Sequence, residues 1–138
     1  MVLEIFSLSD FAADYGNGKL SVIGTFDAVF THHLPAIHPQ CAIAARMRFG
    51  NHEAGHHTFE IRALSPDKTV LHFVKGEGNI QSNPHFDYST QNLVMNLTNF
   101  KLERLGAYAF EFWHNGEFHS GLKMHVLQAL PHGMVKAA

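Results

Sequence analysis

Along much of this chain, apolar and polar residues alternate with a period of two, whereas the period of an amphipathic helix hardly appears. The clearest stretch is residues 40–49, in which every second residue from Cys41 to Phe49 is apolar. Arg46 and Arg48 occupy intervening positions. Because successive side chains of a strand point to opposite faces, this pattern predicts a strand with one face in a hydrophobic core.

The same alternation, with turn-forming residues between the segments, predicts about eight strands and no strong helix. The connection 9–18 has room for one helical turn over residues 11–13. Pro35 and Pro39 are expected to interrupt the chain before the third main strand, and residues 76–85 are expected to form a long loop. Besides residues 40–49, strands are expected at 2–8, 19–30, 58–64, 69–75 and 91–98, and in a final hairpin over 107–127.

The end of the chain adds a more specific signal for the fold. Leu105-Gly106-Ala107-Tyr108 resembles the tyrosine corner of immunoglobulin-like domains, in which the Tyr hydroxyl bonds to upstream backbone. We therefore expect an all-β fold, an antiparallel β-sandwich of about eight strands with immunoglobulin-like topology. A jelly roll is the alternative, because it accommodates eight strands equally well. One domain over residues 1–130 is expected, followed by a C-terminal tail over 131–138.

The register of the final hairpin depends on the turn at Asn115-Gly116. A two-residue loop there would pair Phe110 with Gly121, so that the apolar faces of the two strands fail to match. A three-residue loop that begins one residue earlier would pair Phe112 with Phe118. Because a slip of one residue inverts a whole strand, we predict the three-residue loop.

This register also separates core residues from surface residues. Tyr108 and Phe110 are expected in the core, and Trp113, Glu111 and His119 on the outer face. Trp113 is the aromatic residue whose direction the core does not explain. We therefore take Trp113, Glu111 and His119 as a speculative surface for binding a partner.

Composition is consistent with one domain that folds without disulfides. A chain of 138 residues, 46% hydrophobic and 16% charged, can bury an ordinary core. Its only cysteine, Cys41, lies on the apolar face of its strand, so we expect an inert core thiol. The N-terminal segment carries Glu4 and lacks the basic region of a signal peptide, and no apolar run reaches the roughly 18 residues of a membrane helix. We therefore expect a cytoplasmic protein without membrane partners.

The charge balance bears on the class of partner. Ten Lys and Arg against twelve Asp and Glu give a net charge of −2, which does not favour binding to nucleic acid. The 12 histidines would make the chain net positive on mild acidification, so a pH-responsive scaffold is one hypothesis. Separate, neutral, solvent-facing histidines are the simpler interpretation.

One segment resembles the zinc-hydrolase motif H-E-x-x-H. It consists of His52, Glu53 and His56, and that chemistry needs both histidines on one face of a helix. Here glycines and strand-forming residues surround the motif, which favours a hairpin loop. A looser zinc site made of His52, His56 and His57, joined by histidines of other loops, is the alternative to having no cofactor.

Short motifs spread over the chain resemble a family of small, uncharacterised bacterial proteins, a domain of unknown function. They are Ser9-Asp10-Phe11-Ala12, the Gly-Lys-Leu and Gly-x-Phe-Asp of residues 18–27, the Pro-x-x-His-Pro of 35–39, Gly-x-Tyr-x-Phe in 106–110, and Asn115-Gly116-Glu117. The resemblance implies a bacterial cytoplasmic β-sandwich and supplies no activity. It also implies that residues 50–57 are a variable loop, which weakens the zinc interpretation.

The residues alone do not name a function, and two main hypotheses remain. The first is a non-enzymatic binding or assembly module with an unknown ligand, including self-association as a homo-oligomer through sheet edges. The second is a histidine-rich metal-binding protein or a zinc-dependent hydrolase that uses His52 and Glu53 with His56. The first is favoured, because the motif lacks its helical context.

Overall fold

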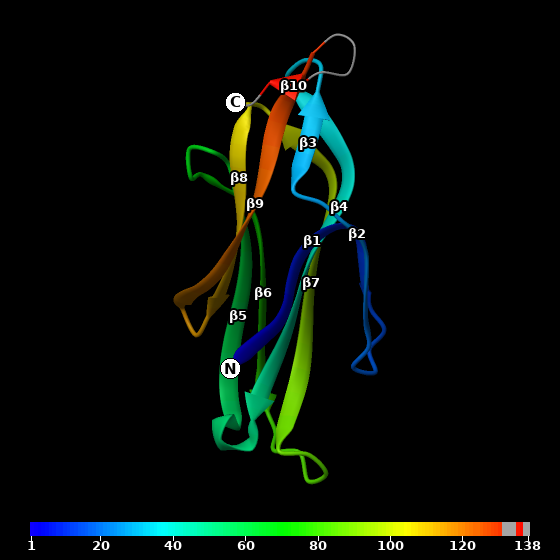
Figure 1. Cartoon of the computed structure of the whole chain (residues 1–138). Helices are drawn as coiled ribbons and strands as arrows, with labels where there is room; N and C mark the ends of the chain where they lie inside the picture. Colours follow the sequence, from blue (N-terminus) through cyan, green and yellow to red (C-terminus); the bar gives the residue numbers. More distant parts are fainter. Residues whose placement is uncertain (131–134, 137–138) are drawn as a thin grey trace.

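The computed structural model describes residues 1–130 and 135–136, which form two β-sheets packed face to face (Figure 1). No α-helix occurs in these residues. The strands are β1 (Val2–Asp14), β2 (Leu20–Thr25), β3 (Ala28–Thr31), β4 (Ala36–Gly50), β5 (Gly55–Leu64), β6 (Val70–Ile80), β7 (Tyr88–Leu102), β8 (Gly106–His114), β9 (Glu117–Ala129) and β10 (Val135–Lys136), with a 3₁₀ turn, η1 (Asn51–Glu53), between β4 and β5.

The smaller sheet has the order β2-β1-β4-β7, and the larger sheet has the order β10-β9-β8-β5-β6 with β3 also paired to β9. All pairs are antiparallel except that of β3 with β9, which is parallel. The expected all-β sandwich is confirmed. The described residues form ten strands, because the segment expected as one strand over 19–30 divides into β2 and β3 and because β10 adds to β9.

The topology within the sandwich is immunoglobulin-like. In that fold, strands B and E pair in one sheet and strands C, F and G in the other. Here β4 and β7 pair in the smaller sheet, and β5, β8 and β9 in the larger. The tyrosine corner is also present: the Tyr108 hydroxyl donates to the Arg104 carbonyl at 3.0 Å, and the Tyr108 ring meets Phe100 edge-on at 5.9 Å.

The middle of β4 is buried on both faces. The alternation predicted for 40–49 is confirmed on the core face, where Cys41 and Phe49 have no exposed area. Ala42 and Ala44, on the opposite face, are fully buried too. They pack with Ala12 and with side chains of β2 and β7, so the β1–β2 hairpin covers the outer face of β4.

The β1–β2 hairpin corrects two expectations for the N-terminal third. Residues 11–13 form no helical turn, because β1 continues through them to Asp14 and pairs with β2. Arg46 then fastens the hairpin to the sheet. Its guanidinium donates to the Gly18 carbonyl at 2.7 Å and to Glu4 at 3.1 Å.

Two segments that were expected to be irregular belong to strands. Pro39 does not interrupt the chain but lies inside β4, opposite Asn99. Pro39 has no N–H to donate, and the positive φ of Asn99, 54°, marks an irregularity in the partner strand at the same point. The expected loop over 76–85 is also wrong in extent. β6 runs to Ile80, because residues 76–80 pair with the first half of β5, and the connection to β7 is residues 81–87.

The turn of the final hairpin corrects the predicted register. Asn115 and Gly116 form a two-residue turn with φ of 50° and 79°, not a three-residue loop. The apolar faces still match, because the register shifts by one residue between Phe112 and Trp113, and His119 is the extra residue of β9. The bulge, and not a longer loop, therefore aligns the apolar faces of β8 and β9.

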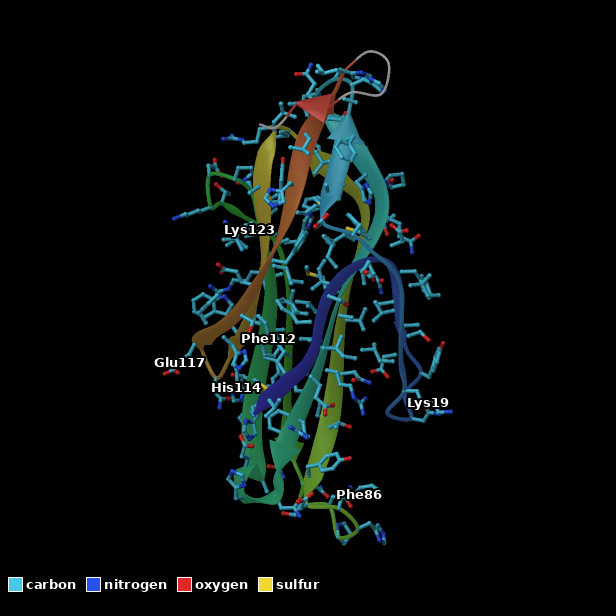
Figure 2. The ribbon with its side chains drawn as sticks, in the orientation of Figure 1. Lys19, Phe86, Phe112, His114, Glu117 and Lys123 are labelled. Carbon is cyan, nitrogen blue, oxygen red and sulfur yellow. The ribbon has the colours of Figure 1, made fainter. Side chains whose placement is uncertain are left out.

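The bulge changes the neighbours of several side chains. Phe110 and Tyr108 lie in the core as expected, opposite Leu122 and Met124 (Figure 2 shows Phe112, on the same face, between the sheets). Phe118, expected to pair with Phe112 in the core, is 54% exposed and lies at the outer surface.

The C-terminal segment lies at the limit of what the structure describes. Of the tail expected over 131–138, residues 131–134 and 137–138 lie outside the described residues, and Val135–Lys136 pairs with β9. Within the described residues, no helix has the length and apolar character needed to cross a membrane.

Replacing Tyr108 by Phe should lower the free energy of unfolding by about 1 kcal/mol, because it removes the hydroxyl bond to Arg104 while keeping the ring in place. Urea denaturation would measure this change. Tyr88→Phe is the matched control, since the Tyr88 side chain is partly exposed and stacks on Phe86. Equal stability of the two variants would contradict this role for the tyrosine corner.

Candidate functional site

A surface hollow of about 630 Å³ opens on the outer face of the larger sheet. It extends over β6, β5 and the end of β8, next to the hairpin whose tip carries Glu117 in Figure 2. Residues of both charges and two aromatic residues line it. They include Thr58, Glu60, Arg62, Lys75, Glu77 and Trp113.

Trp113 and Arg62 form the centre of this face. The Arg62 guanidinium carbon lies 3.9 Å from the centre of the Trp113 ring. Glu60 accepts from Arg62 at 2.7 and 2.9 Å, and the Trp113 indole N–H donates to Glu111 at 3.1 Å. The register explains the arrangement, because Glu60 is opposite Trp113 and Arg62 is opposite Glu111 on adjacent strands. We call these four residues the Trp113 cluster.

The Trp113 cluster holds its long side chains in place before any partner binds. A cation over the face of a Trp ring stabilises by about 0.5–1 kcal/mol at exposed sites and by about 2 kcal/mol when water is excluded. The Arg62 side chain is 30% exposed, so a partner that covers it would strengthen the contact. The conformational entropy lost on binding is also smaller for side chains already fixed.

Exposed aromatic rings flank the Trp113 cluster on both sides. Phe118 on β9 is 54% exposed and meets Trp113 edge-on at 6.0 Å. Phe73 on β6 is 60% exposed, and the Lys75 ammonium lies 5.5 Å from its ring centre. The outer face of the larger sheet therefore combines aromatic side chains with charges of both signs.

The turn of the final hairpin is bonded to β5, which fixes Trp113 in position. Asn115 and Thr58 exchange two hydrogen bonds of 2.9 Å, one from each backbone N–H, with the Thr58 carbonyl and the Asn115 side chain as acceptors. Trp113 lies two residues before this contact. The wall of the hollow is thus held by the hairpin turn as well as by the sheet.

On the core side of the same strands, His57 and His114 form a bonded pair of nearly parallel rings. His57 Nε2 lies 2.7 Å from the carbonyl oxygen of Glu53, and His57 Nδ1 lies 2.8 Å from His114 Nε2. Since a carbonyl only accepts, the proton sits on His57 Nε2, and His114 Nε2 donates to His57 Nδ1. Phe49 and Phe59 surround the pair.

This environment favours a neutral His114 imidazole. Burial lowers the pKa of His114, and the neighbouring His57 lowers it further, while Glu53 acts in the opposite direction. His57 is 8% exposed.

The H-E-x-x-H segment does not form the helix that zinc hydrolases need. η1 ends at Glu53 and β5 begins at Gly55, so His52 and His56 lie on different elements, and their side chains are 85% and 62% exposed. The segment is not a hairpin loop either, because β4 and β5 belong to different sheets and it crosses between them. No three His, Cys, Asp or Glu side chains among the described residues converge as a metal-ligand set.

The catalytic base of that motif is also engaged elsewhere. The Glu53 carboxylate accepts from the Met1 amino group and from the Gly50 backbone N–H, the latter at 3.1 Å. The hydrogen bond from the amino group is the main cause that lowers the Glu53 pKa. A carboxylate with a lowered pKa is a weak proton acceptor, unlike a general base poised near neutral pH.

The structure brings together two of the three surface residues predicted from the sequence. Glu111 and Trp113 are directly bonded. His119, displaced by the bulge, instead meets the core residue Phe112 edge-on at 5.9 Å and lines a hollow next to β1. Cys41 is fully buried, and burial raises its thiol pKa to about 11, which fits an unreactive core residue.

Sequence reasoning missed Arg62 and the flanking rings of Phe73 and Phe118. Alternation over residues 58–64 predicts Arg62 on the outer face of its strand. Its contact with Trp113, however, depends on which strands are neighbours in the sheet. Phe118 was assigned to the core because the bulge was not foreseen. A cross-strand arrangement of this kind has no local signal in the sequence.

The fold defines the chain as an immunoglobulin-like β-sandwich domain. The model of a family of unknown function (DUF6941) matches residues 4–127, and the chain belongs to this family. No curated protein matches it. The expected membership of a family without an assigned activity is confirmed.

Acidification should destabilise the fold in part through His114. Its pKa is lower in the folded chain than in the unfolded chain, so the unfolded state takes up more protons as the pH falls through about 6.5. The stability contributed by neutral His114 is therefore present above that pH and is lost below it. The His114→Gln variant keeps an N–H donor without titrating, and should lose less stability than wild type between about pH 7.5 and 5.5.

Urea denaturation at the two pH values would measure both losses. His85→Gln is the matched control, because His85 is exposed in the 81–87 connection, and it should lose as much stability as wild type. The same pH dependence in His114→Gln as in wild type would contradict the assigned role of the His57–His114 pair.

Proposed function

We propose that this chain is a non-enzymatic binding module that takes a protein partner on the outer face of its larger sheet. The observation that carries the proposal is the contact of 3.9 Å between Arg62 and the Trp113 ring beside an open hollow. Trp and Arg are enriched among residues that dominate binding energy at protein interfaces. Here both are fixed before binding, by Glu60 and Glu111.

A protein partner fits this face better than a small molecule. Phe73 and Phe118, both more than half exposed, extend the aromatic surface beyond the hollow on either side. Charges of both signs surround them, as in the polar rim of an interface. Small-molecule sites are usually enclosed and mostly apolar, with few polar groups.

The same contacts support a binding role over a catalytic one. Glu60 and Glu111 already accept hydrogen bonds from Arg62 and Trp113, which hold them as structural acceptors. The Cys41 thiol is buried away from this face. What the arrangement provides is a rigid aromatic and charged surface.

Selection from a displayed library of random peptides would test this function. Wild-type protein serves as bait, and the Trp113→Leu variant as counter-bait, after circular dichroism shows that the variant folds. Selected peptides should bind wild type at least about tenfold more tightly than Trp113→Leu, as expected for the loss of an interface hot spot. Arg62→Gln is a second variant, expected to weaken the same peptides.

Ile37→Ala is the matched control, because Ile37 is an apolar residue 60% exposed on β4 of the smaller sheet. It should leave peptide binding unchanged. Failure to enrich any peptide over the counter-bait, or equal binding to wild type and both face variants, would refute the proposed function.

A further inference from the structure

The free edge of the larger sheet is β6. Among the described strands, β6 is paired with β5 alone, over almost its whole length of 11 residues. Val70, Leu71 and Phe73 on this strand are 46%, 37% and 60% exposed. A long edge strand with unpaired backbone groups and exposed apolar side chains is a template for pairing with another strand.

β6 carries one positive and one negative side chain, so two antiparallel copies of this strand can place opposite charges across from each other. Lys75 and Glu77 lie two residues apart, so both point to the outer face, where they are opposite Glu60 and Thr58 of β5. In the described part of the chain, Lys75 forms no ion pair, and the ion-pair contact of Glu77 is with His56 at 3.7 Å. The His56 and Glu77 side chains are 62% and 73% exposed, so water screens this contact.

We propose that β6 pairs with β6 of a second copy of this chain, antiparallel and centred on Gly76. In this register Lys75 lies opposite Glu77 of the second copy, and Glu77 opposite Lys75 of the second copy. Phe73 lies opposite Asn79 of the second copy. The two-fold axis creates every one of these contacts twice, as in an isologous dimer.

The charges select this register over its neighbours. A register shifted by two residues in one direction places Lys75 opposite Lys75 of the second copy. The shift in the other direction places Glu77 opposite Glu77. Like charges directly opposite each other across two strands destabilise the pair, whereas opposite charges stabilise it. A shift by one residue would exchange the two faces of the sheet.

The free edges of the smaller sheet are less suited to such pairing. β7 is paired with β4 alone among the described strands, but Asn99 has a φ of 54° that interrupts its extended backbone. β2 has six residues, and Gly24, next to its last residue, has a φ of 73°. β6 is long, and none of its residues has a positive φ.

Pairing through β6 would join the two larger sheets into one continuous sheet. The two Trp113 clusters would then lie on the same side of the dimer, on β5 and β8 and not on the paired β6 strands. Lys75 and Glu77 also line the hollow of the proposed binding face, so self-association is tested through these β6 charges and peptide binding through Trp113 and Arg62.

Sedimentation velocity of the full chain over about 1–500 µM would test this proposal. Wild type should shift from monomer to dimer as its concentration rises. Lys75→Glu and Glu77→Lys each place two like-charge pairs in the dimer, and each should raise the dimer dissociation constant by about tenfold. The double variant Lys75→Glu/Glu77→Lys restores opposite charges and should return the dissociation constant to within about twofold of wild type.

Lys123→Glu and Glu117→Lys on β9 are matched controls, since they change the net charge equally at exposed positions away from the edge. They should leave the dissociation constant unchanged. A wild type that is monomeric at every concentration would overturn the proposal, and so would a double variant no better than the single ones. A monomer that still binds selected peptides would overturn the dimer alone and leave the proposed function standing.

Discussion

The middle of β4 is packed on both faces, and the positions of the two sheets depend on this packing. On the core face, Ile43 and Met47 are fully buried between the sheets; on the other face, Ala42 and Ala44 are covered by the β1–β2 hairpin. Small side chains are required on that outer face, because the hairpin approaches closely. Arg46 then fixes the hairpin through the Gly18 carbonyl.

The site follows from this core by way of sheet order. Phe49 at the end of β4 packs against Phe59 of β5, which sets the position of β5 in the opposite sheet. β5 pairs with β8, and that pairing brings Arg62 beside Trp113. The core beneath the outer face therefore fixes the strands that carry Arg62 and Trp113, so that their contact, although modest in energy, has one geometry.

The sequence predicts the fold class because its signals are local. Alternation identifies β4 and β5, and the residues before Tyr108 identify the tyrosine corner. Prediction from the sequence fails where a tertiary contact overrides the local pattern. Residues 11–13 are extended rather than helical because Ala12 packs against Ala42 and Ala44 of β4. The bulge at His119 arises because the two-residue turn would otherwise leave the apolar faces of β8 and β9 unmatched. Trp113 could be predicted as a surface residue, whereas its contact with Arg62 depends on strand order alone.

The central claim is that the Trp113 cluster is a rigid surface organised before any partner binds. Nitrogen-15 relaxation of the Trp113 indole Nε1–H and the Arg62 Nε–H tests it most directly, because both groups donate to fixed carboxylates. The account predicts order parameters close to those of rigid backbone, about 0.85. Values below about 0.6 for both groups would show independently moving side chains and contradict the account.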